Sequence, residues 1–129
     1  MGLSSSRVEA AVAVSDLAAA RRFYDEQLQL APLEEEEQGV RYRCADTTGI
    51  FVYLAPDNAG KSPATLAGFF VDDLDATMAD LGSRGVGFER YDRPGLKTDD
   101  RGVFQGPGFR ACWVRDPDGN TLAITETSE

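Results

Sequence analysis

A six-residue phrase occurs twice in this chain and limits its fold more than any other feature. Residues 14–19 read Val-Ser-Asp-Leu-Ala-Ala, and residues 71–76 read Val-Asp-Asp-Leu-Asp-Ala. Each copy follows a β-like run and precedes a helix-like run, and its third residue, Asp, is a preferred N-cap. A repeat of this kind indicates one supersecondary unit used twice. The alternative is a pair of unrelated strand-to-helix turns that both use Asp as the cap.

The first half of the chain predicts a β-α-β-β-β unit. Residues 8–14 place valines on one face with period two, which predicts a strand, and residues 17–28 carry an apolar stripe at helical spacing. Three β-prone runs follow, separated by glycine-containing turns. They predict strands over 33–37, 40–45 and 50–55.

The same order of elements restarts after a stretch rich in proline, glycine and polar residues. The second half predicts a strand over 66–71, a helix from Asp73 to Arg84, and strands over 88–91, 110–114 and 121–125. An Asp-Pro-Asp-Gly turn precedes the last strand. The predicted organisation is a flexible tail (1–6), a first module (7–56), a linker (57–65) and a second module (66–127).

Residues 92–109 show no clear element, and they combine two prolines with several glycines and charges of both signs. A structureless run of this length is unusual in a compact domain and predicts a lid, a binding loop or an interface arm. The alternative is a disordered excursion, and one strand of the second module could be hidden here. Lys97 and Arg101 in this run could reach a ligand carboxylate or phosphate, or remain solvated.

The composition disfavours several classes of function. A net charge of −9 argues against nucleic acids and anionic membranes as partners, but it is compatible with a cationic ligand. The chain has no histidine, which removes histidine-based catalytic triads and most transition-metal sites. No membrane-spanning run or secretory signal is evident, and reduced thiols are expected at Cys44 and Cys112. We therefore expect a cytoplasmic protein.

Three segments carry a family resemblance: Val14–Leu17 with Phe23 and Tyr24 after it, Val71–Leu74, and Arg115–Asn120. With the doubled βαβββ order, they resemble the vicinal oxygen chelate superfamily, which includes glyoxalase I, extradiol dioxygenases, fosfomycin-resistance enzymes and bleomycin-resistance proteins. The run Tyr91–Thr98 looks like a glyoxalase-like bacterial subgroup. The resemblance covers roughly residues 7–127. It implies an α+β fold in which two βαβββ modules form curved mixed sheets around a cleft.

The resemblance also implies where a metal would bind. Metal enzymes of the superfamily carry ligands on the first, fourth, fifth and last strands, and these points fall on Glu9, Tyr53, Leu66 and Ala123. Only Glu9 could bind a cation, whereas a catalytic transition-metal site needs about three protein ligands. We therefore expect no metal and no cofactor, and metal-dependent glyoxalase or dioxygenase activity is disfavoured.

Strand alternation then predicts which side chains would line the implied cleft. Small residues would open space, and aromatic residues would give flat apolar surfaces, as in small-molecule sites. The alternatives are an idle core and, for the aromatic residues beside the long loop, an anchor for the loop or a dimer contact. The predicted ligand-binding residues are Glu9, Phe51, Tyr53, Leu66, Phe70, Phe104, Trp113 and Ala123.

Glu9 is the one candidate catalytic residue. It could bind a ligand cation or act as a general base, or it could pair with Arg41, Arg43 or Arg110. The leading hypothesis is a metal-free protein, without catalysis, that sequesters a small organic molecule such as an antibiotic or natural product. The alternative is a metal-independent lyase or isomerase that uses Glu9 as the base. A homodimer is expected in either case.

Overall fold

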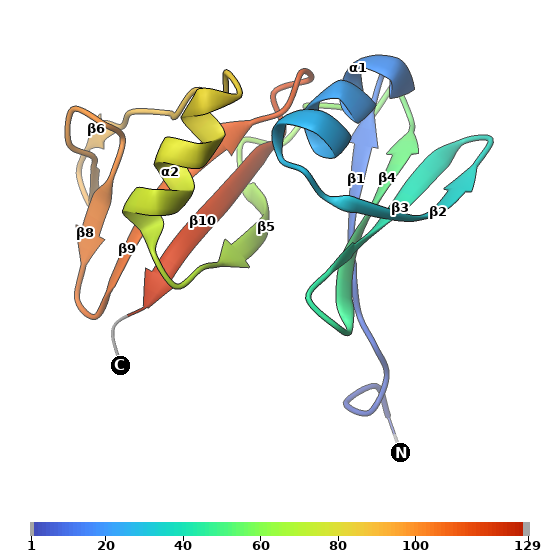
Figure 1. Cartoon of the computed structure of the whole chain (residues 1–129), viewed down its shortest axis with the longest axis horizontal. Helices are drawn as coiled ribbons and strands as arrows, with labels where there is room; N and C mark the ends of the chain where they lie inside the picture. The colour runs from blue at the N-terminus through green and yellow to red at the C-terminus, as the bar shows by residue number, and fades with distance from the viewer. Residues whose placement is uncertain (1, 128–129) are drawn as a thin grey trace. The chain divides into compact units, whose positions relative to one another are not determined.

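The computed structural model describes residues 2–127, and the chain divides into two compact units, Met1–Lys61 and Ser62–Glu129. Each unit consists of a four-stranded mixed sheet with helical structure on one side (Figure 1). This confirms the α+β architecture that the family resemblance implies. Residue 1 of the predicted tail lies outside the described residues. In the described part of the tail, the Ser6 amide donates a hydrogen bond to the Leu3 carbonyl. Within residues 2–127, no helix is long and apolar enough to cross a membrane.

The first unit has its strands in the spatial order β1-β4-β3-β2. The β1–β4 pair is parallel, and the β3–β4 and β2–β3 pairs are antiparallel. The chain passes from β1 to its parallel partner β4 through the helix and the strands β2 and β3. The elements are β1 (Ala10–Val14), α1 (Leu17–Arg21), a π-helical continuation (Arg22–Gln27), β2 (Ala31–Glu36), β3 (Gly39–Cys44) and β4 (Thr48–Leu54).

The helix predicted over 17–28 is present, but its second half is π-helical. Asp16 caps it, since its carboxylate accepts a hydrogen bond from the Ala19 amide at 3.2 Å. The widened turn is tied to the sheet through Asp25, which accepts hydrogen bonds from the side chains of Arg21 and Tyr42. The core of this unit is formed by the side chains of Val12, Val14, Ala20, Phe23, Tyr24, Val40, Tyr42, Ile50 and Val52.

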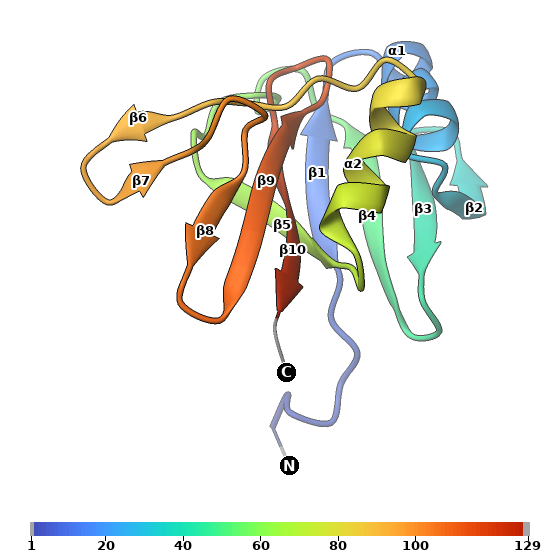
Figure 2. The same ribbon diagram turned by 60° about the vertical axis from the view of Figure 1, so that its left-hand side comes forward.

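The second unit repeats this topology with the strand order β5-β10-β9-β8. Again the first pair is parallel and the other two pairs are antiparallel. A separate hairpin, β6–β7, projects away from the four-stranded sheet of the same unit (Figure 2). The elements are β5 (Thr65–Phe70), α2 (Leu74–Ser83), β6 (Asp92–Arg93), β7 (Leu96–Lys97), β8 (Phe104–Gly106), β9 (Phe109–Arg115) and β10 (Thr121–Thr127).

One helix covers one side of this second sheet. Asp73 caps α2 by accepting a hydrogen bond from the Ala76 amide at 3.0 Å, as Asp16 does in the first unit. The helix buries its apolar stripe against the alternate residues of β9 and β10. Fully burying such a side chain contributes roughly 1.5–3 kcal/mol. The side chains buried here are Leu74, Met78, Leu81, Cys112, Val114, Leu122 and Ile124.

Several predicted boundaries were wrong, each for a local reason. Residues 88–91 form no strand, although the Glu89 amide donates to the Trp113 carbonyl. The run 92–109 contains the β6–β7 hairpin and the short strand β8, so it is not structureless, and β8 is the strand of the second module that the sequence allowed to be hidden there. In the first unit, β2 starts at Ala31 and includes Pro32. A proline is tolerated there because β2 is an edge strand.

Candidate functional site

Each sheet leaves one face without a helix, and these two helix-free faces hold most of the predicted site residues. In the first unit, the large apolar side chains at even-numbered positions of β1, β3 and β4 are buried, namely Val12, Val14, Val40, Tyr42, Ile50 and Val52. The odd-numbered residues therefore point to the other side, because side chains alternate along a strand. In the second unit the same alternation places Ala111, Trp113, Ala123 and Thr125 on the side opposite α2.

Strand register arranges the first unit's helix-free face in rows. One row contains Ala11, Phe51, Arg41 and Glu34, and the next contains Ala13, Tyr53, Gly39 and Glu36. The rings of Phe51 and Tyr53 stack with centroids 5.7 Å apart and an interplanar angle of 13°. A Cβ atom at Gly39 would lie 2.9 Å from the Phe51 ring, so the glycine lets that ring lie flat on the sheet.

Arg41 lies at the centre of this face. Its guanidinium carbon is 4.6 Å from the centroid of the Phe51 ring, and its Nε donates to Glu9 Oε1 at 2.8 Å. Its Nη1 lies 3.5 and 3.3 Å from carboxylate oxygens of Glu34 and Glu36. The hydrogen bond to Glu9, opposed by desolvation, raises the pKa of the guanidinium above its ordinary value. The sequence suggested Arg41, Arg43 or Arg110 as the partner of Glu9, and in the structure Arg41 is the one that binds it.

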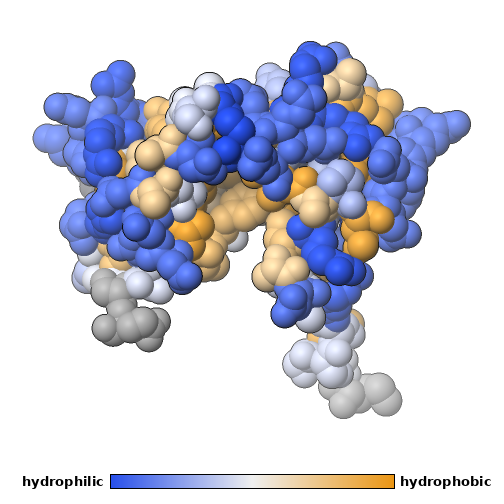
Figure 3. Space-filling view, viewed as in Figure 1, coloured by the Kyte–Doolittle hydropathy of each residue, from blue (hydrophilic) through white to orange (hydrophobic). Residues whose placement is uncertain are grey.

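Glu9 retains one carboxylate oxygen without a hydrogen bond. Its side chain is 18% exposed, and Oε2 is buried with no hydrogen-bond partner within residues 2–127. Arg7 Nη1 lies 3.5 Å from that oxygen. Three carboxylates, Glu9, Glu34 and Glu36, thus share the Arg41 guanidinium, and the exposed run 34–37 makes the β2 edge hydrophilic (Figure 3). This cluster is rich in hydrogen-bond acceptors.

The helix-free face of the second unit instead presents aromatic side chains and small side chains. Its register places Phe70, Thr125, Ala111 and Phe104 in one row across the sheet, and Gly68, Ala123 and Trp113 in the next. Small side chains therefore lie between aromatic ones. Phe70, on the edge strand β5, is 78% exposed, which is unusual for so large an apolar side chain.

Four aromatic residues form a connected cluster at the other edge of this face. The Trp113 and Tyr91 rings meet edge to face, with centroids 5.5 Å apart and an interplanar angle of 83°. The centroid of the Phe104 ring lies 6.3 Å from that of Trp113 and 5.8 Å from that of Phe109. Such pairs contribute about 0.5–1.5 kcal/mol each beyond the area they bury. All four remain partly exposed, so their rings present apolar surface on a fixed support.

The structure groups the predicted ligand-binding residues by unit. Glu9, Phe51 and Tyr53 lie on one helix-free face, and Phe104, Trp113, Ala123 and Phe70 lie on the other. Leu66 is the exception, because the β5–β10 register shifts between Thr121 and Leu122 and leaves Leu66 without a partner. Alternation therefore does not fix the side to which Leu66 points.

Sequence reasoning missed the contribution of two residues to these faces. Arg41 entered only as a possible partner of Glu9, although its odd position in β3 would have placed it beside Phe51 once the register was known. Tyr91 was placed in a strand, and no local pattern indicates that its ring reaches Trp113. Both contacts depend on distant pairing.

The four family positions for a metal do not fit one. In the first unit, Glu9 is engaged by Arg41 and Arg7, and Tyr53, which pairs with Ala13 in the register, stacks on Phe51. In the second unit, Leu66 and Ala123 have no donor atoms in their side chains. Across residues 2–127, no group of three or more His, Cys, Asp and Glu side chains could hold a metal ion.

Comparisons with known proteins agree with this architecture. The sequence model of the Glyoxalase/Bleomycin resistance protein/Dioxygenase superfamily matches residues 7–124. No curated protein matches the chain significantly. A similar solved structure is a glyoxalase family protein from Bacillus anthracis, with 19% sequence identity, a TM-score of 0.74 and 96% of each chain covered. Another is the antibiotic-binding protein TnmS3 from Streptomyces sp. CB03234, with 24% identity, a TM-score of 0.73 and coverage of 96% of this chain and 97% of that chain. A third is a glyoxalase/bleomycin resistance protein from Catenulispora acidiphila DSM 44928, with 25% identity, a TM-score of 0.68 and coverage of 95% of this chain and 99% of that chain.

Proposed function

We propose that this chain, which belongs to the Glyoxalase/Bleomycin resistance protein/Dioxygenase superfamily, binds a small organic molecule and sequesters it without turnover. The fold itself does not select this function, since one fold hosts many chemistries. The proposal rests on the two faces and on the side chains that they present.

The observation that carries the proposal is the aromatic cluster around Trp113. Tyr91, Phe104, Phe109 and Trp113 contact one another on a face that no helix of the second unit covers. Beside them lie Ala123 and Gly68, whose small or missing side chains do not project from the sheet. Flat apolar rings next to small residues suit the stacking of a planar organic ligand.

The first unit's helix-free face, considered by itself, is suited to a cationic group. Glu9, Glu34 and Glu36 supply more acceptor oxygens than Arg41 can satisfy, and Glu9 Oε2 has no hydrogen bond within residues 2–127. The chain as a whole carries a net charge of −9. An ammonium or amidinium group would complement this cluster. The acidic balance of the chain favours an aromatic antibiotic or natural product that carries a positive charge.

The relatives' names agree with this ligand class without establishing it. TnmS3 is described as an antibiotic-binding protein, and two other similar structures are described as glyoxalase/bleomycin resistance proteins. We further propose that binding needs no metal, because Tyr53, Leu66 and Ala123 stand at the family's other ligand positions.

A second candidate function follows from the orphan oxygen of Glu9. Arg41 holds Oε1, which leaves Oε2 available to accept a proton from a bound molecule. In that case the protein would be a metal-independent lyase or isomerase with Glu9 as the general base.

We also propose a cytoplasmic homodimer. Cys44 and Cys112 are both free thiols, which suits a reducing compartment. The exposed Phe70 lies on the edge strand β5, and such an edge is suited to contact with a second copy. Sedimentation equilibrium tests the dimer, and Phe70→Ser should shift the protein toward the monomer.

Native mass spectrometry tests the proposed function. The purified protein is measured alone, with a panel of divalent metals, and with cationic aromatic antibiotics, and the mixtures are then analysed for products by liquid chromatography. Stoichiometric antibiotic binding with no product supports sequestration. A product that Glu9→Gln abolishes supports the second candidate. Stoichiometric metal uptake, or no binding of any compound by a folded protein, contradicts the proposal.

A further inference from the structure

A pocket on the other side of the second unit is separate from the aromatic face. Its volume is about 380 Å³, within the range of small-molecule sites. Arg110 and Gln105 are paired in the β8–β9 register, and neighbouring Phe104 points to the opposite side of the sheet. The lining residues are Lys97, Thr98, Asp99, Arg101, Val103, Gln105 and Arg110.

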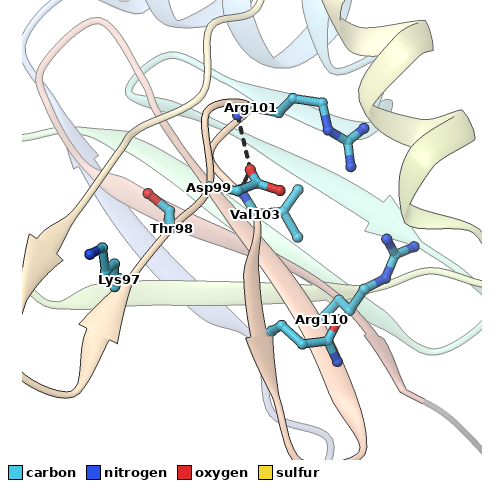
Figure 4. Close-up of a pocket in the computed structure, with 7 residues that line it drawn as sticks. Lys97, Thr98, Asp99, Arg101, Val103 and Arg110 are labelled. Carbon is cyan, nitrogen blue, oxygen red and sulfur yellow. Dashed lines mark hydrogen bonds between the residues drawn. The ribbon is translucent and has the colours of Figure 1, made fainter.

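The helix α2 holds two of the lining residues in place. Asp75, in the first turn of α2, binds Arg101 Nη2 at 3.0 Å and Arg110 Nη2 at 3.3 Å. Arg110 also binds Glu126 at 3.2 Å. Figure 4 shows the side chains of Arg101 and Arg110 extending in the same direction, with Lys97 at the opposite end of the pocket lining.

The pocket has more charged donors than its own carboxylates use. Arg101 Nε and Nη1, Arg110 Nε and the Lys97 ammonium make no hydrogen bond or ion pair within residues 2–127. Asp99 is the one acidic lining residue, and its Oδ1 already accepts the amides of Arg101 and Val103, each at 2.9 Å. The backbone hydrogen bond from Val103 is the main cause that lowers the pKa of Asp99, so this carboxylate stays ionised and engaged.

The turn that presents Arg101 is fixed by the backbone. Gly102 has φ of +96°, and a Cβ atom there would lie 2.7 Å from the Glu89 carbonyl oxygen. The Gly102 amide donates to the Asp99 carbonyl at 3.0 Å. A donor held in place loses less conformational freedom on binding than a mobile one.

The charge distribution also singles out this region. Residues 90–110 contain five basic and three acidic residues, a net charge of +2 in a chain of −9. Arginine side chains bind carboxylates and phosphates through paired hydrogen bonds. From these observations we propose that the pocket binds a small anionic molecule, with its carboxylate or phosphate at Arg101 and Arg110 and a second anionic group toward Lys97.

Amide chemical shifts measured by NMR test this site directly. The full-length protein is titrated with acetate, inorganic phosphate and succinate at constant ionic strength, with sodium chloride as the reference salt. We expect saturable shifts at Thr98, Val103 and Gln105 for the two dianions, and weaker ones for acetate. Phosphate and succinate separate the two anion chemistries, since the stronger binder identifies the group that the arginines prefer.

Three variants decide whether the lining residues are responsible. Arg101→Gln should weaken binding about tenfold, the effect of losing a charge-assisted hydrogen bond. Lys97→Gln should reduce succinate binding to the level of acetate. Arg93→Gln is the control, because Arg93 lies over the Tyr91 ring and does not line the pocket. Absence of saturable shifts, or equal weakening by Arg93→Gln, would overturn the proposal. If Arg101→Gln fails to fold, Lys97→Gln still tests the proposal, because Lys97 is exposed and its substitution should leave the fold intact.

Discussion

The two units share a strand order but differ in what their helix-free faces present. In the first unit, the centre of the face is Arg41 between Phe51 and three carboxylates. In the second, the corresponding surface consists of Trp113, other aromatic rings and small residues. The helical sides remain alike, because each must bury an apolar core beneath a helix capped by Asp. Duplication of a unit thus conserves the packed side and leaves the other side free to acquire function.

The largest effect that would sharpen this contrast is expected from Trp113→Ala. Removing the ring deletes the contact with Tyr91 and Phe104, and we expect ligand affinity to fall by roughly 2 kcal/mol, typical of a central aromatic contact. Isothermal titration calorimetry with an antibiotic that binds the wild type measures the loss. Trp113→Phe is the matched control and should retain most of the affinity. Equal affinity of Trp113→Ala and wild type would show that the second unit's helix-free face does not bind the ligand.

In the first unit, Arg41→Ala should destabilise the fold itself. The substitution leaves the largely buried Glu9 carboxylate without its 2.8 Å donor, at a cost of about 1–3 kcal/mol. Urea denaturation measures the change. The double variant Arg41→Ala/Glu9→Gln should recover part of the loss, because an amide is less costly to leave unpaired than a charge. No recovery would mean that Arg41 acts through its packing on Phe51 instead.

The capping residues test the likeness of the helical sides. Asp16→Ala and Asp73→Ala each remove a side-chain acceptor from a helix N-terminus, and each should cost about 1 kcal/mol of unfolding free energy. The expected result is similar losses in the two variants, measured by thermal denaturation. Asp16→Asn and Asp73→Asn are the controls, since Asn also caps well. A negligible loss at one position would show that the repeated phrase is not used alike in the two units.

Acid should only slightly weaken the stabilisation that the second unit gains from the charge network formed by Asp75 and Glu126 with Arg101 and Arg110. Hydrogen bonds with arginines lower the pKa of Asp75, and the amide of Leu74 and Arg110 lower the pKa of Glu126. Carboxylates with a lowered pKa stabilise the fold at pH above their unfolded values, near 4, and lose this contribution as the pH falls further. The effect is small because the pairs are exposed.

The melting temperature as a function of pH checks this expectation. Asp75→Asn should melt below the wild type near neutral pH, and the difference should shrink as the pH drops below about 4. Asp57→Asn is the control, because Asp57 is exposed and makes no ion pair in the described part of the chain. A pH profile of Asp75→Asn that runs parallel to the wild type would contradict the network's role.

The sequence predicted the fold well because its signals are local. The repeated phrase places a strand end and a helix cap at residues 14–16 and 71–73, and alternation in β1, β4 and β10 gives the buried faces. These are properties of neighbouring residues. The resemblance implied only that the modules form curved mixed sheets, and the order of the strands comes from the structure.

Features that depend on pairing were predicted less well. The short strand β8 is stabilised by β9 and has little β-propensity of its own, so residues 104–106 read as part of a loop. The register shift at Leu66 and the stacking of Arg41 on Phe51 both arise between strands that are distant in sequence. The candidate site was therefore predicted in its residue types, such as Phe104 and Trp113, more than in its contacts.

Fluorescence of Trp113 tests the central claim most directly. It is the chain's single tryptophan and lies on the second unit's helix-free face, so its emission reports on that face alone. The protein is titrated with cationic aromatic antibiotics, and binding is confirmed in parallel by native mass spectrometry. We predict a saturable change in emission for the compounds that bind. Compounds that bind stoichiometrically and leave Trp113 emission unchanged would contradict the assignment of the ligand to this face.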